Sequence, residues 1–337
     1  MKLQVRFGAH VYPYTREVAW RHRFTIASFL TTVALIAWGG FVTSINAGLA
    51  VPDWPTSFNS FDPFNPWPEW WTITPVLAEH GHRLVGALVG IFTVFLGIWT
   101  WISDPRKWMR YLGLGAILLV SLQGTLGGLR VIWVSLDLAV VHAALAQVFF
   151  SLMAAMVLFT SRSWLAVSSV PSESKFTPSL RSLVVVTVAA LYLQIILGAL
   201  LRHPGTGINP LLAALHITGA FVSSGLVLAT YLLVRWAFTE CRLLRKVAGW
   251  MFGLLGLQVL LGLTAYFVLI DEVGMLRPSN LQVIVNTVHL LIGAFLLASS
   301  VVLALLALRH PETVTTSDSG TEEPVLSANL LEHPRSN

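Results

Sequence analysis

Long apolar runs separated by short polar segments dominate the chain. Each run is about twenty or more residues long, which is the length an α-helix needs to cross ~30 Å of hydrocarbon. The runs lie at positions 24–46, 79–101, 111–131, 138–160, 183–202, 211–235, 248–270 and 283–308. The pattern therefore predicts an all-α, polytopic membrane protein with eight transmembrane helices.

The polar segments around these runs complete the predicted organisation. Residues 1–23 carry five basic side chains and lead into an apolar segment without an A-x-A cleavage site, so we expect a retained cytoplasmic segment rather than a signal peptide. Residues 161–182 are predicted to form a cytoplasmic linker. Residues 309–337 are polar, with no long apolar run, which indicates a disordered cytoplasmic tail.

The basic residues are distributed unevenly about these spans. If the N-terminus is cytoplasmic, only Arg83, Arg130, Arg202 and Arg277 of the 21 Lys and Arg residues lie on the outer side. Because cytoplasmic segments carry an excess of basic residues, we expect both termini inside, in a cell inner (plasma) membrane. The net charge of +5 then reflects contact with the inner lipid surface and requires no nucleic-acid partner.

Similar segments recur in the two halves of the chain. "HRLVGALVG" in the second run matches "HITGAFVSSG" in the sixth, "LQGTLGGLRVI" matches "LQVLLGLTAYF", and "VHAALAQVFF" matches "VHLLIGAFLL". Four helices thus occur twice in the same orientation. We expect two tandem, pseudo-symmetric four-helix bundles, at 24–160 and 183–308, related by an axis along the membrane normal.

Four of the ten histidines lie inside spans, each one to two turns from the outer end of an even-numbered helix: His82, His142, His216 and His289. An ionisable residue within a span indicates function, because its burial is costly. A small residue follows each histidine one turn later on the same face, at Gly86, Ala146, Ala220 and Gly293. Two such histidines per unit suit one heme clamped between them.

Simpler interpretations of these residues stay open. Small residues also promote helix packing, and each histidine can hydrogen-bond a neighbour. Zinc is a competing metal, but a structural zinc site uses four ligands around one ion, whereas the repeats divide the histidines two and two. Arg130 and Arg202 at outer helix ends are candidates for contacts with heme propionates, or for side chains that snorkel to the interface.

Several segments together resemble the heme A synthase family: "NAGLAVPDWP" (46–55), "EHGHRLVG" (79–86), "LQGTLGGLRV" (122–131) and "HAALAQVFF" (142–150). The resemblance implies an eight-helix enzyme that oxidises the C8 methyl of heme O to the formyl of heme A for cytochrome oxidase. It also implies that His82 and His142 hold the substrate heme and that His216 and His289 hold a permanent heme b. Heme O synthase and cytochrome oxidase assembly factors are the implied partners, and the electron donor is not identified.

One feature departs from many bacterial members of that family, which carry a cysteine pair in the first outer loop. Residues 47–78 contain no cysteine, and the chain's single cysteine, Cys241, is predicted on the cytoplasmic side. We expect the loop to be held by proline and aromatic packing instead. The aromatic residues concerned are Phe58, Phe61, Phe64, Trp67, Trp70 and Trp71.

Glu79 distinguishes the two halves. It stands three residues before His82, on the same helix face, whereas Ala213 stands three residues before His216. We expect Glu79 to bring charge or base chemistry to the heme edge in the N-terminal unit alone, with His80 and Arg83 anchoring the helix. The alternative is that Glu79 is favoured only by the dipole at a helix N-terminus.

Two other function classes are compatible with the same residues. A diheme electron carrier of the cytochrome b type would bind two permanent hemes without bond chemistry. A transporter built from repeats would be expected to hold its substrate near the midplane in broken helices, whereas the ionisable residues here gather toward the outer face. The heme types bound by the purified protein distinguish the first two classes.

Overall fold

The computed structural model describes residues 15–166, 176–202, 209–271 and 278–309. The helices in these ranges are α1 (Arg16–Ser44), α2 (Glu69–Thr72), α3 (Thr74–Ser103), α4 (Lys107–Ile132), α5 (Leu136–Thr160), α6 (Arg162–Ala166), α7 (Thr177–Arg202), α8 (Pro210–Ala237), α9 (Arg242–Asp271) and α10 (Asn280–Leu308). Eight of them are long and apolar enough to cross a membrane, which confirms the predicted all-α membrane fold. The described residues contain no β-strand.

Some predicted segments cannot be compared with the structure. Positions 1–14 of the N-terminal segment, 167–175 of the linker and 310–337 of the tail lie outside the described residues. The histidines at positions 10, 203, 310 and 333, which are not candidate ligands, also lie outside the described residues.

Helix boundaries differ from the predicted spans. Helix α1 begins at Arg16 rather than at position 24, because Thr15 caps it by accepting a hydrogen bond from the Val18 N–H at 3.3 Å. The predicted linker at 161–182 contains α6 and the first turns of α7. A hydropathy window ends at the first charged residues, whereas a helix continues beyond the hydrocarbon into the polar headgroup region.

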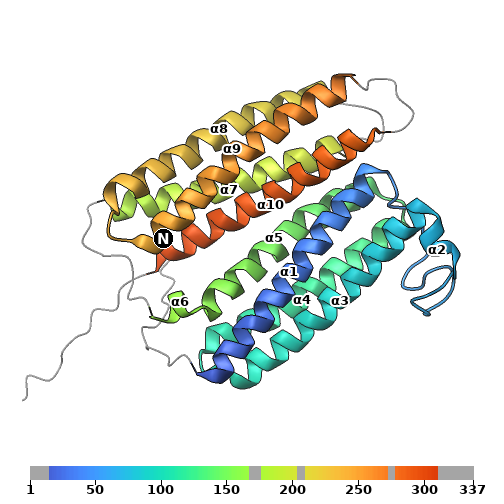
Figure 1. The fold of residues 1–337 in the computed structure, drawn as a ribbon, viewed down its shortest axis with the longest axis horizontal. Coiled ribbons are helices and arrows are strands. Elements are labelled where there is room, and N and C mark those ends of the chain that lie inside the picture. The colour runs from blue at the N-terminus through green and yellow to red at the C-terminus, as the bar shows by residue number, and fades with distance from the viewer. Residues whose placement is uncertain (1–14, 167–175, 203–208, 272–277, 310–337) are drawn as a thin grey trace, which may run out of the picture.

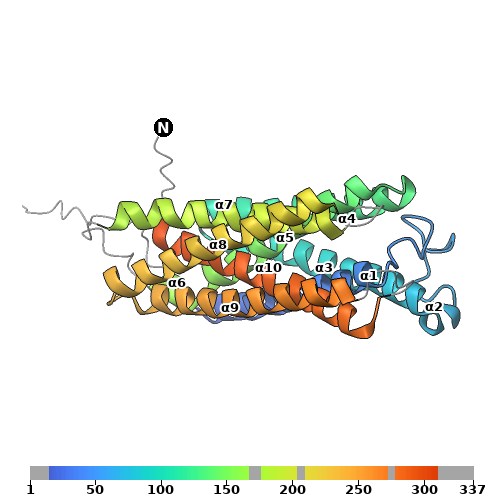
Figure 2. The same cartoon turned by 90° about the horizontal axis from the view of Figure 1, so that it is seen from above.

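The long helices pack as two sets of four (Figure 1). In the first set α1, α3, α4 and α5 contact one another in a ring, and α7, α8, α9 and α10 do so in the second. The sets meet where α10 packs against α1 and α5, and where α5 contacts α7. Figure 2 shows the same bundle from above, with all long helices running along one direction. A pseudo-twofold axis between the sets stays a prediction.

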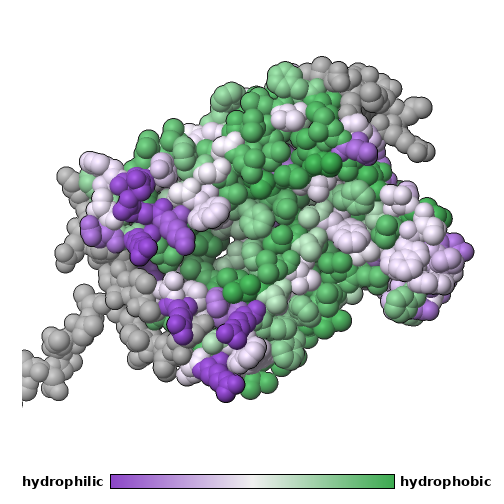
Figure 3. All heavy atoms as spheres, viewed as in Figure 1, coloured by the Kyte–Doolittle hydropathy of each residue, from purple (hydrophilic) through white to green (hydrophobic). Residues whose placement is uncertain are grey.

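The two ends of the bundle differ in chemistry. We call the end where α1 begins the inner end, after its predicted orientation, and the end carrying α2 and residues 45–73 the outer end. Hydrophilic residues gather at the inner end and a hydrophobic surface covers the helices between the two ends (Figure 3). Exposed apolar side chains of the long helices, such as Ile91, Phe221 and Leu260, then face lipid rather than water.

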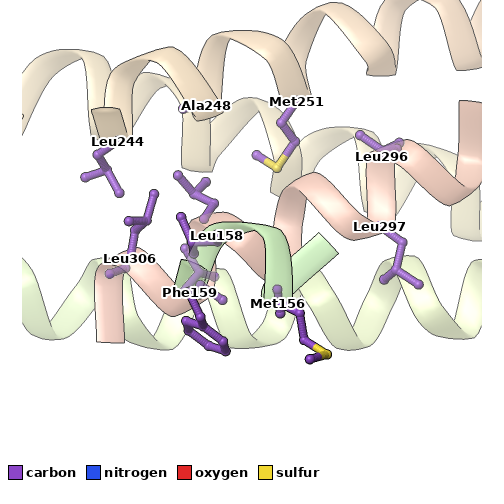
Figure 4. Packing of buried hydrophobic residues seen from close by; sticks show 14 of the residues in the cluster. Met156, Leu158, Phe159, Leu244, Ala248, Met251, Leu296, Leu297 and Leu306 are labelled. Atoms are coloured by element: carbon purple, nitrogen blue, oxygen red, sulfur yellow. The ribbon is translucent and has the colours of Figure 1, made fainter. Parts of the chain in front are cut away.

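The tightly packed core lies in the inner half of the bundle. Figure 4 shows buried apolar residues of α5, α9 and α10, among them Met156, Ala248, Met251 and Leu306, that belong to one large cluster. At the same end the buried Asp104 carboxylate pairs with Arg21 of α1 at 2.8 Å and with Arg106 at 2.7 Å. Arg106 also donates to the Phe159 carbonyl of α5 at 3.0 Å, so this group ties three helices together.

The outer half of the C-terminal set is packed less tightly. Among the described residues, the last buried position of α7 is Leu191 and the first buried position of α8 is Ser223. The buried apolar residues of α9 end at Leu255. The inward side chains beyond these positions are only half-buried or exposed. The outer halves of α7, α8 and α9, on the side of the bundle that holds His216 and His289, thus have no buried described side chain.

Candidate heme sites

The four predicted histidines occupy equivalent places, each against a glycine of the preceding long helix. A Cβ built on Gly39 of α1 would lie 3.0 Å from His82 Cε1, and one on Gly127 of α4 would lie 3.0 Å from His142 Cε1. The corresponding distances are 3.1 Å between Gly198 and His216 and 3.2 Å between Gly262 and His289. Such contacts are too close for most side chains, so glycine is what lets each imidazole lie against the neighbouring backbone.

The small residues predicted beside the imidazoles have a different role. Gly86 faces Leu35, whose Cδ1 would lie 3.8 Å from an added Cβ, and Gly293 faces the Gln258 amide. The predicted small residues stand on the histidines' own helices, whereas the glycines that touch the rings stand on the adjacent helices. Contacts between helices are not visible in the periodicity of one helix.

The histidines are brought together in pairs. His82 interacts electrostatically with His142, and His216 with His289. All four side chains are half-buried. Among the described residues no three His, Cys, Asp or Glu side chains gather into a group that could hold a metal ion. Two imidazoles per set match the two axial positions of a heme and not the four ligands of a structural zinc site.

Three glutamines that the sequence analysis did not single out as site residues contact these rings. Gln123 Nε2 lies 3.5 Å from His142 Nε2, Gln194 Nε2 lies 3.1 Å from His216 Nδ1, and Gln258 Nε2 lies 3.3 Å from His289 Nε2. Each glutamine stands one turn before the glycine that touches the same ring. The signal is the repeated spacing Gln-x-x-x-Gly on α4, α7 and α9, which is seen only when odd-numbered spans are compared with one another.

The two candidate arginines lie close to the histidine pairs but are partly engaged. Arg130 interacts electrostatically with His82 and donates to the Gly48 carbonyl at 2.7 Å. Arg202 interacts electrostatically with His289 and donates to the Gly40 carbonyl of α1 at 3.0 Å and to Ser44 Oγ. Arg202 therefore links the two sets of helices. A guanidinium has five N–H donors, so each arginine retains donors for an anionic group.

Glu79 is 3% exposed and both of its carboxylate oxygens are engaged. Oε2 accepts from the Val51 N–H at 2.9 Å, and Oε1 accepts from Arg83 Nη2 at 3.0 Å. Arg83 in turn donates to the carbonyls of Val51, Asp53 and Thr56. The Glu79 carboxylate and the Arg83 guanidinium therefore hold one end of the outer loop together, a role that was not predicted for Glu79.

The outer loop is held mainly by polar contacts. His80, buried at 2% exposure, lies 2.8 Å from the Pro63 carbonyl and packs its ring against Trp70 with centroids 5.1 Å apart. Phe61 is 81% exposed and Phe64 60% exposed, so the predicted aromatic packing is wrong for these two residues. The charged and histidine side chains of α3 reach the loop's backbone, and the two phenylalanines are not needed to fix it.

Asp53 organises the centre of this loop. Its carboxylate accepts hydrogen bonds from the Thr56 hydroxyl and from the N–H groups of Phe58, at 2.7 Å, and Asn59, at 2.8 Å. Burial raises the pKa of this carboxyl, but the hydrogen bonds outweigh it and the net pKa lies below its ordinary value. Asp53 is therefore ionised at physiological pH and stabilises the turn that presents carbonyls to Arg83.

The chain matches a known protein family over more than half its length. A model of the COX15-CtaA family, described as cytochrome oxidase assembly protein, matches residues 22–210. The chain belongs to the COX15-CtaA family. The match covers α1 to α7, and so includes Glu79, His82 and His142 as well as both arginines, whereas His216 and His289 lie beyond it.

Curated relatives of this COX15-CtaA protein carry one name. The chain is 29% identical over 257 residues to "Heme A synthase" of Symbiobacterium thermophilum, and the match covers 69% of this chain and 81% of the relative. It is 27% identical over 196 residues to "Heme A synthase" of Lysinibacillus sphaericus, covering 56% and 59%, and 26% identical over 189 residues to that of Shouchella clausii, covering 54% and 58%. For the last two relatives, the chain spans under two thirds of their length.

Proposed function

We propose that this membrane protein is a heme A synthase, an oxidoreductase that converts the C8 methyl group of heme O into the formyl group of heme A for cytochrome oxidase. The observation that carries the proposal is the pairing of four histidines, two in each set of helices, each ring lying against a glycine. Membership of the COX15-CtaA family and the name shared by its relatives support the reaction.

The residues present fit two hemes. Imidazole is a common axial ligand of heme iron, and each histidine pair offers two of them. His82 Nδ1 and His289 Nδ1 are buried without a hydrogen-bond partner among the described residues, as expected for rings arranged for another group. The half-buried inward residues of α7, α8 and α9 around His216 and His289 leave the packing looser where a second heme would lie.

The two sets take different roles in this proposal. His82 and His142 hold the substrate heme O, and His216 and His289 hold a permanent heme b, which supplies one-electron transfer. Arg130 and Arg202, each beside one pair, orient the propionates through charge-assisted hydrogen bonds. Arg202 also fixes the distance between the sets through α1.

Glu79 supports the chemistry at the substrate. Conversion of a methyl to a formyl group removes four electrons and adds one oxygen atom, which comes from dioxygen if a histidine ligand leaves, or from water attacking at the heme edge. Both routes generate positive charge or release protons near the methyl group. We assign Glu79, the carboxylate beside His82, to stabilise that charge or to accept a proton from water, with Arg83 adjusting its position.

The proposed setting is the cell inner (plasma) membrane, with both termini in the cytoplasm. Heme O is the substrate. A heme O synthase, cytochrome oxidase assembly factors and an electron-transfer protein are the partners that this reaction requires, and membrane lipid surrounds the apolar helix faces.

Single histidine substitutions test the proposal. The four variants His82→Ala, His142→Ala, His216→Ala and His289→Ala are purified from cells that make heme O, and their hemes are extracted and identified. We expect the last two to lose heme b, and the first two to keep heme b but form no heme A. His22→Gln, whose ring lies 2.9 Å from Thr160 at the inner end, is the matched control and retains both hemes. Wild-type heme A yield from His82→Ala and His142→Ala would contradict the assignment.

A further inference from the structure

One short pattern recurs on the three odd-numbered spans after the first. It is "QGTLG" at 123–127 in α4, "QIILG" at 194–198 in α7 and "QVLLG" at 258–262 in α9. In each case the glycine admits a histidine ring from the next helix, and the glutamine one turn earlier places its amide 3.1–3.5 Å from a nitrogen of that ring. Because residues four apart share a helix face, the two positions act on one imidazole together.

Two of these glutamines are anchored through their amide nitrogens, and all three have a side-chain oxygen without a hydrogen-bond partner among the described residues. Gln123 Nε2 donates to the His142 backbone carbonyl at 2.9 Å, and Gln194 Nε2 donates to the His216 carbonyl at 2.8 Å. The Oε1 atoms of Gln123, Gln194 and Gln258 are all buried and have no hydrogen-bond partner among the described residues. Three buried acceptors in equivalent places indicate a shared purpose, since buried polar atoms are otherwise paired.

The chemistry of a ligating histidine supplies that purpose. When one ring nitrogen binds a metal, the other carries a hydrogen and is oriented by an acceptor beside it. His142 Nδ1 already lies 3.2 Å from the Gln123 backbone carbonyl, and a rotation of the side-chain amide would add its Oε1 as a second acceptor beside the ring. The hydrogen bond fixes the ring and raises the basicity of the nitrogen on the metal, which strengthens the bond to iron.

Helix α1 lacks this device. The corresponding segment is "LIAWG" at 35–39, in which Gly39 touches His82 but Leu35 stands where the other helices have glutamine. His82 Nδ1 is buried and has no hydrogen-bond partner within the described parts of the chain. Glu79, one turn away on the same helix, is already bonded to Val51 and Arg83. His82 is therefore held by packing alone.

We propose that Gln123, Gln194 and Gln258 are positioning residues that lock His142, His216 and His289 on iron, and that Leu35 leaves His82 as the exchangeable ligand of the substrate heme. The inference rests on the proposed assignment of the four histidines as ligands. It identifies which bond opens when the substrate site needs a free iron position or when heme O enters and heme A leaves. The glutamines act through the histidines and not on the hemes themselves.

The first test removes the glutamine amide beside one histidine ligand of the permanent heme. In Gln258→Leu the His289 ring loses the side-chain oxygen that the proposal brings to it, so the ferric state is less stabilised and the midpoint potential of heme b rises. Gln258→Glu keeps an oxygen at the same reach and retains the low potential. Gln147→Leu is the matched control, because Gln147 is a buried glutamine of α5 whose Oε1 also has no hydrogen-bond partner among the described residues and which stands in the other set of helices. A heme b potential in Gln258→Leu equal to that of the control would overturn the proposal.

The second test adds a glutamine amide beside His82, the ligand of the substrate heme that lacks one. Carbon monoxide binds a ferrous heme with two histidine ligands only after one of them dissociates, so its binding rate reports ligand release. In wild-type protein we expect the heme of the N-terminal set to bind carbon monoxide and heme b to resist it. Leu35→Gln should slow this binding about tenfold, the lower range for a change in a ligand's hydrogen-bond partner. Leu35→Met, which keeps the bulk without an amide, should bind as the wild type does.

Equal carbon monoxide binding by both hemes of the wild type, or an unchanged rate in Leu35→Gln, would refute the role of Leu35. Both tests measure bound heme rather than turnover. Failure of the proposed function would be seen differently, as a wild-type protein that holds heme O and never forms heme A while the potential shift in Gln258→Leu persists.

Discussion

The four histidines show what a sequence reveals at the scale of single residues. Their depth in the apolar spans marked them, because an ionisable group there is costly. The glycines and glutamines that hold them were missed as site residues, since each stands on a neighbouring helix and carries no charge. Glu79 was singled out by its spacing from His82, but its two hydrogen bonds to Val51 and Arg83 could not be predicted from spacing alone.

Glu79 also offers a sharp prediction at this scale. Glu79→Gln removes the negative charge but retains an oxygen that accepts from Val51, so folding and heme b are preserved. If the carboxylate takes part in proton transfer or charge stabilisation, heme A formation falls about 10²-fold or more and heme O or its alcohol accumulates. The extracted hemes are separated by chromatography.

Arg83→Gln is the matched control for that prediction. It breaks the same ion pair and loosens the loop, but leaves the carboxylate in place. We expect it to retain more activity than Glu79→Gln. Wild-type heme A yield from a well-expressed Glu79→Ala protein would remove Glu79 from the mechanism and leave it as the anchor of the loop.

At the scale of elements, the spans were predicted well and the connections were not. Apolar runs of sufficient length identify helices, because lipid leaves the backbone no alternative. The segment between α3 and α4 is only three residues long, yet it holds the buried Asp104, which no pattern in the sequence singled out. Its partners are Arg21, far away in the sequence, and Arg106.

Asp104→Asn should therefore destabilise the protein. The substitution leaves two buried guanidinium groups without their counter-charge, which costs about 3 kcal/mol, and thermal unfolding in detergent should occur at a lower temperature. Asp62→Asn, in the exposed part of the outer loop, is the control and should unfold as the wild type does. Equal melting temperatures of Asp104→Asn and wild type would contradict a structural role.

The pH dependence of that stability follows from the same contacts. Burial alone would raise the pKa of the Asp104 carboxyl. The hydrogen bonds from Arg106 and the charge of Arg21 have the larger, opposite effect, so the net pKa lies below its ordinary 3.8. A lowered folded-state pKa means that the stabilisation is fully present above 3.8 and is lost as the pH falls through the folded value. The difference in melting temperature between wild type and Asp104→Asn should thus stay constant from pH 5 to 8 and shrink in stronger acid.

At the scale of the whole molecule, the two ends of the bundle differ in their packing and in the residues they carry. The inner end is closed by the apolar core and the Asp104 cluster, and the outer end carries the histidines and the loop. Composition and run length were sufficient for the membrane class, whereas the orientation given by the distribution of positive charge stays a prediction. The relation between the sets depends on contacts such as Arg202 with α1, which no repeat in the sequence reveals.

Orientation is tested with Cys241, the only cysteine in the chain. It lies at the inner end between α8 and α9, so a membrane-impermeant maleimide should label it in inside-out vesicles and not in right-side-out vesicles. Burial and the neighbouring Glu240 raise the pKa of its thiol, so labelling should accelerate as the pH rises above the range that suits an ordinary cysteine. Phe61→Cys in a Cys241→Ser chain, on the exposed outer loop, should show the opposite sidedness. Labelling of Cys241 only from the outer side would invert the topology.

The heme composition of the purified wild-type protein tests the central claim most directly. Protein from cells that make heme O is analysed by its pyridine hemochrome spectrum and by chromatography of the extracted hemes. The account predicts heme b together with heme O or heme A, with heme A appearing over time and only while His82 and His142 are intact. Two equivalents of heme b, with no heme O bound and no heme A formed, would contradict it and identify a diheme electron carrier instead.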